Sequence, residues 1–203
     1  DITVSNGTLS NFAGSGTTYT ATFTPSSDGA TTIAVAAGVY TDAPGNANTA
    51  SNTFAWTYDS TSPTLTSVSI ASTNTTPTLV KHGEDVVLTF TASETIGTPV
   101  VTFLSGEAAI TDGLINYSNT SGNTWTATYD VRYSDTEGAV TFSVAFSDTV
   151  GNVGTAVTAV TDGTSVTFDK TPPTISEVTA ITTPTNDNTP SYVFTTNEAG
   201  SIT

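Results

Sequence analysis

The sequence predicts an all-β protein built from tandem sandwich repeats, and three observations carry this prediction. Apolar and polar residues alternate over short runs, which is typical of strands with one buried face. Thr, Val, Tyr and Phe are frequent in these runs and favour strands, whereas long stretches rich in Glu, Lys, Ala and Leu are absent. Several short motifs also recur at offsets of 104 to 110 positions, which indicates internal repeats.

The composition limits the partners of the chain. Its 18 acidic and 3 basic residues give a formal net charge of −15. A surface this acidic repels phosphate backbones and anionic headgroups, so we expect no nucleic-acid binding and expect divalent cations as partners. The absence of Cys excludes disulfides, thiolate metal sites and a Cys nucleophile. No apolar run is long enough to span a membrane, so we expect no membrane insertion in this segment.

Four motifs recur in the same order and set the domain boundaries. The motifs and their second copies are 18–23 and 124–129, 42–46 and 148–152, 58–65 and 168–175, and 90–94 and 194–198. The offset predicts a complete repeat at 63–172, the C-terminal part of a repeat at 1–62 and the N-terminal strands of a further repeat at 173–203. Pro residues at 60–63 and 170–173 predict short, stiff links between these units. Because the chain has no Met, we expect it to be a processed or excised segment.

Period-two alternation predicts the strands of the complete repeat in order. We expect strands near 86–92, 124–129 and 140–146, and a less regular one over 160–168. The expected inward-facing residues are Val86, Leu88, Phe90, Ala92, Trp125, Ala127, Tyr129, Val140, Phe142, Val144 and Phe146. Gly-, Asn- and Asp-rich turns separate the strands, and seven or so short strands in about 110 residues are typical of a β-sandwich.

The complete repeat resembles the bacterial Ig-like (BIg-type) tandem repeats of large extracellular surface adhesins. The resemblance is carried by the Asp-x-x-Gly-Asn turn at 148–152, the strand at 124–129 and the Phe-Asp-Lys-Thr-Pro-Pro link at 168–173. Residues 1–62 resemble a sister repeat. The resemblance implies immunoglobulin-like Greek-key β-sandwiches, one complete and two partial, in a secreted or cell-surface protein that is often loaded with calcium.

Three carboxylates are predicted to converge at the first joint between repeats. In an immunoglobulin-like sandwich the B–C and F–G loops lie at the end where the chain enters. Glu94 follows strand B, Asp148 follows strand F, and Asp59 lies in the link above that end. Carboxylates held together repel one another unless a cation lies between them. Ca²⁺ takes 6–8 oxygen ligands, so we expect a Ca²⁺ site there, with Asn152 and backbone carbonyls completing the shell.

The same logic assigns ligands to the neighbouring joints. The next joint would start from Asp169 and Glu198, and Asp42 would serve the joint before residue 1. An alternative is that Asp-x-x-Gly-Asn is only a tight turn, in which Asp caps the turn and Gly supplies a positive φ. That alternative accounts for Asp42 and Asp148 but leaves Asp59 and Glu94 unexplained.

No set of residues predicts catalysis, so we expect that the protein is not an enzyme. His82 lies in a polar turn without a Ser/Asp partner pattern. The pair Glu84–Asp85 is interpreted as a solvated strand end, because glycosidase carboxylates need a cleft and a set separation.

The leading hypothesis is therefore a calcium-stiffened spacer rod of a large surface protein that functions in cell adhesion. Its partners would be neighbouring repeats, while other domains would bind a host or surface ligand. The alternative is a subunit of an extracellular filament or pilus, in which strand complementation joins copies head to tail. A carbohydrate-binding module would need exposed aromatic residues clustered on one face, which the sequence does not predict.

Overall fold

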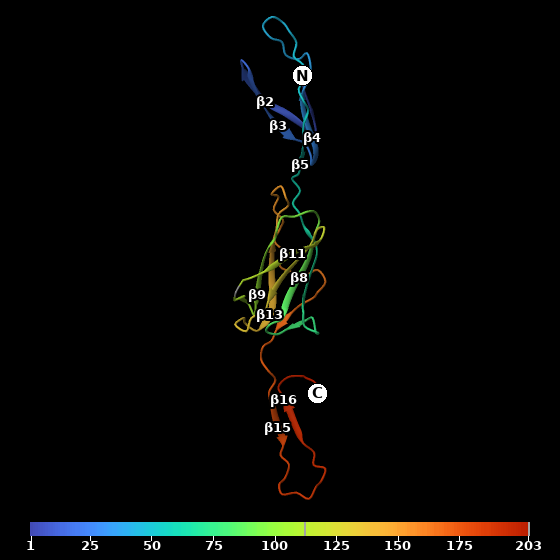
Figure 1. Cartoon of the computed structure of the whole chain (residues 1–203), viewed down its shortest axis with the longest axis vertical. Helices are drawn as coiled ribbons and strands as arrows, with labels where there is room; N and C mark the ends of the chain where they lie inside the picture. Colours follow the sequence, from blue (N-terminus) through green and yellow to red (C-terminus); the bar gives the residue numbers. More distant parts are fainter. Residues whose placement is uncertain (112, 203) are drawn as a thin grey trace.

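The computed structural model describes residues 1–111 and 113–202, and it confirms the all-β fold class. Three bodies follow one another along a single axis, with the N-terminal strands at one end and the C-terminal hairpin at the other (Figure 1). Every strand pairs within its own body, and no sheet crosses the links at 59–64 and 169–174 in the described part of the chain. None of the described residues forms a helix suited to crossing a membrane. The three-part division of domains stays a prediction.

The central body is a closed sandwich of two sheets. One sheet has the order β11 (Asn116–Ser121), β12 (Thr124–Asp130), β8 (Asp85–Ala92) and β6 (Leu65–Ser72). The other has the order β10 (Ala108–Ala109), β9 (Val100–Ser105), β13 (Gly138–Ala145), β14 (Thr167–Phe168) and β7 (Leu79–Val80). Only β7 and β14 are parallel among these pairs of described strands. This is the A-B-E-D and C-F-G arrangement of an immunoglobulin-like fold.

The core of the central body follows the predicted alternation. All the predicted inward residues of β8, from Val86 to Ala92, are buried, as are those from Val140 to Phe146. Tyr129 of β12 is also fully buried and packs on Phe103, with ring centroids 4.9 Å apart. Two sheets that bury alternate residues against each other form one continuous core.

The predicted strand over 160–168 is wrong for most of its length. Only Thr167–Phe168 forms a strand, and within this stretch only Val166 and Phe168 are buried. The preceding residues touch β13 through an isolated bridge, Val144 with Val157, and reach β6 through Thr161. A chain that crosses between the two sheets cannot keep a regular ladder, so the alternation there is weak.

The two terminal bodies are open. The N-terminal body has a three-stranded sheet, β1 (Ile2–Ser5), β4 (Gly29–Val35) and β5 (Phe54–Tyr58), and a hairpin of β2 (Gly7–Ser15) and β3 (Thr18–Pro25). The C-terminal body is one hairpin of β15 (Ile175–Thr179) and β16 (Val193–Thr196). Many of their large apolar side chains are exposed, among them Phe12, Phe54, Ile175 and Tyr192.

Candidate metal centre at the first joint

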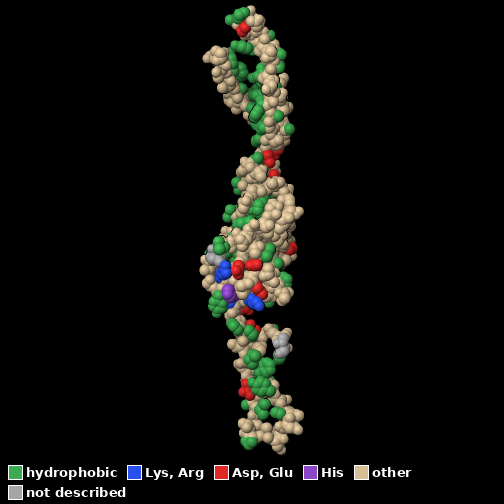
Figure 2. Space-filling model, in the orientation of Figure 1, with side chains coloured by type: hydrophobic (Ala, Val, Ile, Leu, Met, Phe, Trp, Pro, Cys, Tyr) green, Lys and Arg blue, Asp and Glu red, His purple; other side chains and the backbone are tan. Residues whose placement is uncertain are grey.

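Three carboxylates from distant parts of the sequence meet where the first link enters the central sandwich. Asp59, Glu94 and Asp148 each offer an oxygen, and these oxygens all lie within 4.8 Å of one another. Asp59 directly follows β5, Glu94 follows β8, and Asp148 follows β13. The structure therefore brings together the three residues that the sequence predicted at this joint. Figure 2 shows acidic side chains gathered between the first two bodies.

The Asp148 turn is held together by hydrogen bonds within the turn itself. Asp148 Oδ1 accepts hydrogen bonds from the backbone N–H groups of Val150, Gly151 and Asn152, while Oδ2 accepts one from Asn152 Nδ2 (2.7 Å). Gly151 has a φ of 106°, a conformation that favours glycine. Burial raises the pKa of Asp148, but the hydrogen bonds from Asn152, Gly151 and Val150 outweigh it and hold this pKa below its ordinary value. Asp148 is thus fixed as an anion.

Glu94 is placed beside this turn by backbone pairing between two loops. Ile96 forms an isolated bridge with Asp148, and the N–H of Gly97 donates to Ser147 O (2.9 Å). Burial, followed by repulsion from Asp59, Asp148 and Asp28, raises the pKa of Glu94. Among the described residues, no hydrogen bond or ion pair reaches its carboxylate. Glu94 is the unsatisfied member of the cluster.

The link is tied to the sandwich independently of any metal. Asn152 Nδ2 donates to the backbone oxygen of Asp59 (3.1 Å), and the N–H of Ser93 donates to Thr64 O (2.8 Å). The Asn152 amide nitrogen is therefore used as a bridge between loop and link, which leaves its oxygen as the atom that could bind a metal. Asp59 Oδ1 accepts from the N–H of Thr61 (3.0 Å) and is held within the link.

Asp28 is a further acidic residue of this joint that the sequence did not predict. It precedes β4 of the N-terminal body and accepts hydrogen bonds from Ser60 N, Ser60 Oγ and Thr61 Oγ1. These bonds lower its pKa, and its charge acts on Glu94. The available signal is Asp28-Gly29, which returns as Glu137-Gly138 at an offset of 109, within the range of the other motifs.

Among the described residues, no ion pair joins a Lys or Arg side chain to Asp59, Glu94 or Asp148. Lys and Arg side chains gather at the opposite end of the central body, together with the only His (Figure 2). There Arg132 pairs with Asp130, Lys81 pairs with Glu84, and Lys170 donates to the backbone oxygens of two nearby residues. The central repeat is therefore electrostatically polarised along its length, with uncompensated negative charge at its entry end.

The oxygen set fits a calcium ion better than the common alternatives. Ca²⁺ binds oxygen at about 2.3–2.6 Å, so two ligands on opposite sides of one ion lie up to about 5 Å apart. Oxygens within 4.8 Å of one another can thus share one Ca²⁺. Mg²⁺ binds at about 2.0–2.1 Å and needs a narrower octahedral set. Zn²⁺ prefers His or Cys, and neither is present in this cluster.

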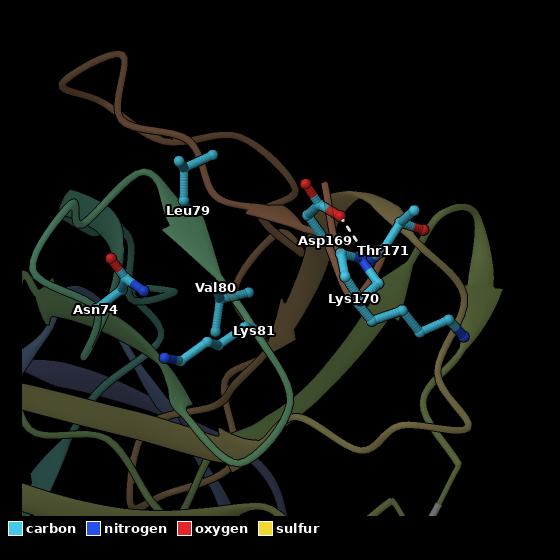
Figure 3. A pocket seen from close by; sticks show the side chains of 8 residues that line it. Asn74, Leu79, Val80, Lys81, Asp169, Lys170 and Thr171 are labelled. Carbon is cyan, nitrogen blue, oxygen red and sulfur yellow. Dashed lines mark hydrogen bonds between the residues drawn. The ribbon is translucent and has the colours of Figure 1, made fainter. Parts of the chain in front are cut away.

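The second joint has the same kind of link hydrogen bonds as the first joint, but the described residues there do not form a cluster of three carboxylates. The N–H of Thr171 donates to Asp169 Oδ1 (2.9 Å), as Thr61 does to Asp59, and Glu137 Oε1 accepts from Lys170 N and Thr171 Oγ1, as Asp28 does in the first link. Figure 3 shows Asp169 bonded to Thr171, with the amines of Lys81 and Lys170 pointing to opposite sides. Among the described residues, neither Asp169 nor Glu198 belongs to a group of three potential ligands.

Asp42 forms the same turn as Asp148 but, within the part of the chain that the structure describes, belongs to no group of three potential ligands. Asp42 Oδ1 accepts from the N–H of Asn46 (2.7 Å) and Oδ2 from Asn46 Nδ2 (2.9 Å), and Gly45 has a φ of 95°. These hydrogen bonds lower the pKa of Asp42. The turn interpretation therefore describes the local geometry at both sites. The metal roles of Asp42, Asp169 and Glu198 stay predictions.

Comparison with known families agrees with this fold. Residues 1–58 match the family described as the bacterial Ig-like domain, which confirms the resemblance to bacterial immunoglobulin-like repeats. The match ends at Tyr58, the last residue of β5, so Asp59 is the first residue beyond the matched domain. Such domains are structural or adhesive repeats, typically non-enzymatic and commonly found at the cell surface. No curated protein matches the chain.

Proposed function

We propose that this chain is a spacer segment of an extracellular adhesive protein, and that Ca²⁺ bound by Asp59, Glu94 and Asp148 stiffens its first joint. The observation that carries the proposal is Glu94: its carboxylate lies with those of Asp59 and Asp148, its pKa is raised, and it forms no ion pair with any other residue that the structure describes. A divalent cation would replace this repulsion with attraction.

The three ligands come from three different structural units, which gives the metal a mechanical role. Asp59 belongs to the link, Glu94 to the loop after β8, and Asp148 to the loop after β13. An ion shared among them would cross-link the preceding repeat to both loops of the central sandwich. Without the ion, Asn152 and the Asp28 hydrogen bonds would still hold the link, but the carboxylates would push it away from the loops. The metal would therefore change stiffness rather than create the fold.

Thermal unfolding tests this function. A ligand at about a hundred times its dissociation constant should raise the Tm of a repeat of this size by about 10 °C. We expect such a rise between EDTA and millimolar Ca²⁺, and we expect Glu94→Gln to reduce it strongly. Glu107→Gln is the matched control, because it removes the same charge from an exposed residue in the β9–β10 turn. Equal Tm values in EDTA and in Ca²⁺ would contradict the proposal and would mean that the joint consists of a turn and a link that bind no metal.

A further inference from the structure

The chain enters and leaves the central sandwich through two segments that lie side by side. β6 follows the first link, and the segment 161–169, which contains β14, leads into the second link. The two links lie at opposite ends of the sandwich (Figure 1). Both segments run in the same direction, because their contacts advance together from Val68 with Thr161 to Ile70 with Thr164, and β7 then pairs with β14 in parallel. Tension applied through the links would therefore draw the two segments past each other.

In the entry half of this contact, side-chain hydroxyls take the place of a backbone ladder. The N–H of Thr161 donates to Val68 O (2.8 Å), and the N–H of Val68 donates back to Thr161 Oγ1 (3.0 Å). The N–H of Ile70 donates to Thr164 Oγ1 (2.9 Å). The Thr164 hydroxyl itself donates to Asp162 Oδ1 (2.7 Å), which leaves a lone pair of this hydroxyl for the N–H of Ile70. Asp162 therefore positions Thr164 as an acceptor.

In the exit half, backbone hydrogen bonds of the short parallel pair continue the contact. The N–H of Thr167 donates to Thr78 O (2.9 Å), and the N–H of Asp169 donates to Val80 O (3.0 Å). The side chains of Val80 and Phe168, which belong to this pair, are both buried in the core. Separating the two strands would therefore break these hydrogen bonds and also expose apolar side chains to water.

We propose that this contact is a mechanical clamp, in which β6 and β7 hold the segment 161–169 against tension along the rod. The proposal rests on the proposed function, because a spacer between two distant parts is a chain under tension. Hydrogen bonds that lie across the direction of the pull are loaded together, so several must break in one step. Hydrogen bonds that are peeled from one end break one after another, at a lower force. The parallel course of the two segments produces the first kind of loading.

The inner strands of the sandwich lie outside the direct line of pull. β8 and β12 pair with each other, but neither of them continues into a link. Tension therefore reaches them only through their neighbours. This pair also contains a contact between two hydroxyls, because Thr91 Oγ1 of β8 and Thr124 Oγ1 of β12 lie 3.0 Å apart. Removing these two hydroxyls is thus a matched control for removing the two hydroxyls of the clamp.

Single-molecule pulling of the whole chain from its two ends, in EDTA, tests the clamp. We expect Thr161→Val with Thr164→Val to unfold the central sandwich at a clearly lower force than the parent, because both hydroxyl acceptors are lost while the branched shape is kept. The control, Thr91→Val with Thr124→Val, should unfold at the force of the parent. An unchanged force in the first variant, or an equal loss of force in both, would overturn the proposal.

Denaturant titration of the same proteins shows whether each variant still folds cooperatively. If the Thr161 and Thr164 variant does not, Asp162→Ala takes its place, because it keeps both threonines and removes only the acceptor that orients the Thr164 hydroxyl. We then expect a smaller loss of unfolding force, and an unchanged force would overturn the clamp. Because pulling is done without metal, a failed clamp would leave the calcium proposal intact. Failure to bind calcium would likewise leave the clamp intact.

Discussion

Under the proposed function, we expect Glu94 to determine how the first joint responds to protons and to metal. Its raised pKa means that, without a metal, its ionised form is less favourable in the folded chain than in the unfolded chain. This destabilisation is absent when Glu94 is protonated and grows as pH rises through its folded pKa, which lies above the ordinary 4.5. Asp148 behaves in the opposite way, because its stabilising charge is lost only as pH falls through a folded pKa below 3.8. The two pH windows are therefore separate.

In EDTA, we expect the Tm of the central repeat to rise as the pH falls from 7 toward the folded pKa of Glu94. Protonation of Glu94 removes its repulsion from Asp59 and Asp148. Glu94→Gln should be more stable than the parent at neutral pH in EDTA and should lack this rise. In millimolar Ca²⁺ the trend should reverse, because protons compete with the metal. Calorimetry at several pH values measures both trends, and parallel profiles for parent and variant would refute the role of Glu94.

Gly154 lets the loop after β13 lie directly against the link. A Cβ at this position would lie 2.3 Å from Phe146 Cε2 and 2.7 Å from Pro63 O. We expect Gly154→Ala to destabilise the repeat by about 1–3 kcal/mol, because neither the buried ring nor the link backbone has room to move. Gly97→Ala is the control, since its Cβ would meet only Ser147 O, at 3.9 Å. Chemical denaturation of both variants measures the difference, and equal losses would show that the close approach has no cost.

At the scale of the strand, equivalent residues of the central repeat and the C-terminal body differ in how deeply they are buried. Phe90 is fully buried in β8, whereas Phe194, at the same position of β16, is only partly buried. Phe90→Ala should cost about 3–5 kcal/mol of unfolding free energy. Phe194→Ala should leave the unfolding of the central repeat unchanged, because Phe194 lies in the β15–β16 hairpin outside the central sandwich. Denaturant titration distinguishes the two, and a small loss for Phe90→Ala would contradict the observed core.

The strands show what the sequence could and could not predict. Alternation identified 86–92 and 140–146 because both are regular strands with one face on the core. It failed over 160–168, where the chain crosses between sheets and only Thr167–Phe168 pairs in a ladder. The convergence of Asp59, Glu94 and Asp148 was predictable because strand order fixes which loops share an end. Asp28 was missed because its role depends on hydrogen bonds to a link that is 32 and 33 positions away.

The link hydrogen bonds give a prediction about order between repeats. Asp28→Ala removes the acceptor for Ser60 and Thr61 while leaving Asp59, Glu94 and Asp148 in place. We expect the N-terminal body to reorient more freely in EDTA and to regain most of its order in Ca²⁺. Residual dipolar couplings of the first two bodies measure this reorientation. Equal order in EDTA for parent and variant would contradict a role for Asp28 in holding the link.

At the scale of the whole molecule, the bodies form a rod whose properties depend on its joints. The central repeat supplies a closed core, and each link is held by an acidic residue of the preceding repeat, Asp28 or Glu137. The joints differ in charge, because Ser60 in the first link is replaced by Lys170 at the equivalent position of the second. Under the proposed function, the first joint would therefore depend on an external cation more than the second joint does. The stiffness of such a rod would therefore differ from one joint to the next, according to the charges at each joint.

Calcium binding by the whole chain, measured by isothermal titration calorimetry, tests the central claim most directly. Metal-free parent protein should bind Ca²⁺ with a stoichiometry near one, and Glu107→Gln should do the same. Glu94→Gln should bind far more weakly, because it removes one of the three charged ligands at the joint. No saturable binding by the parent at millimolar Ca²⁺, or equal binding by parent and Glu94→Gln, would contradict a calcium-stiffened joint at Asp59, Glu94 and Asp148.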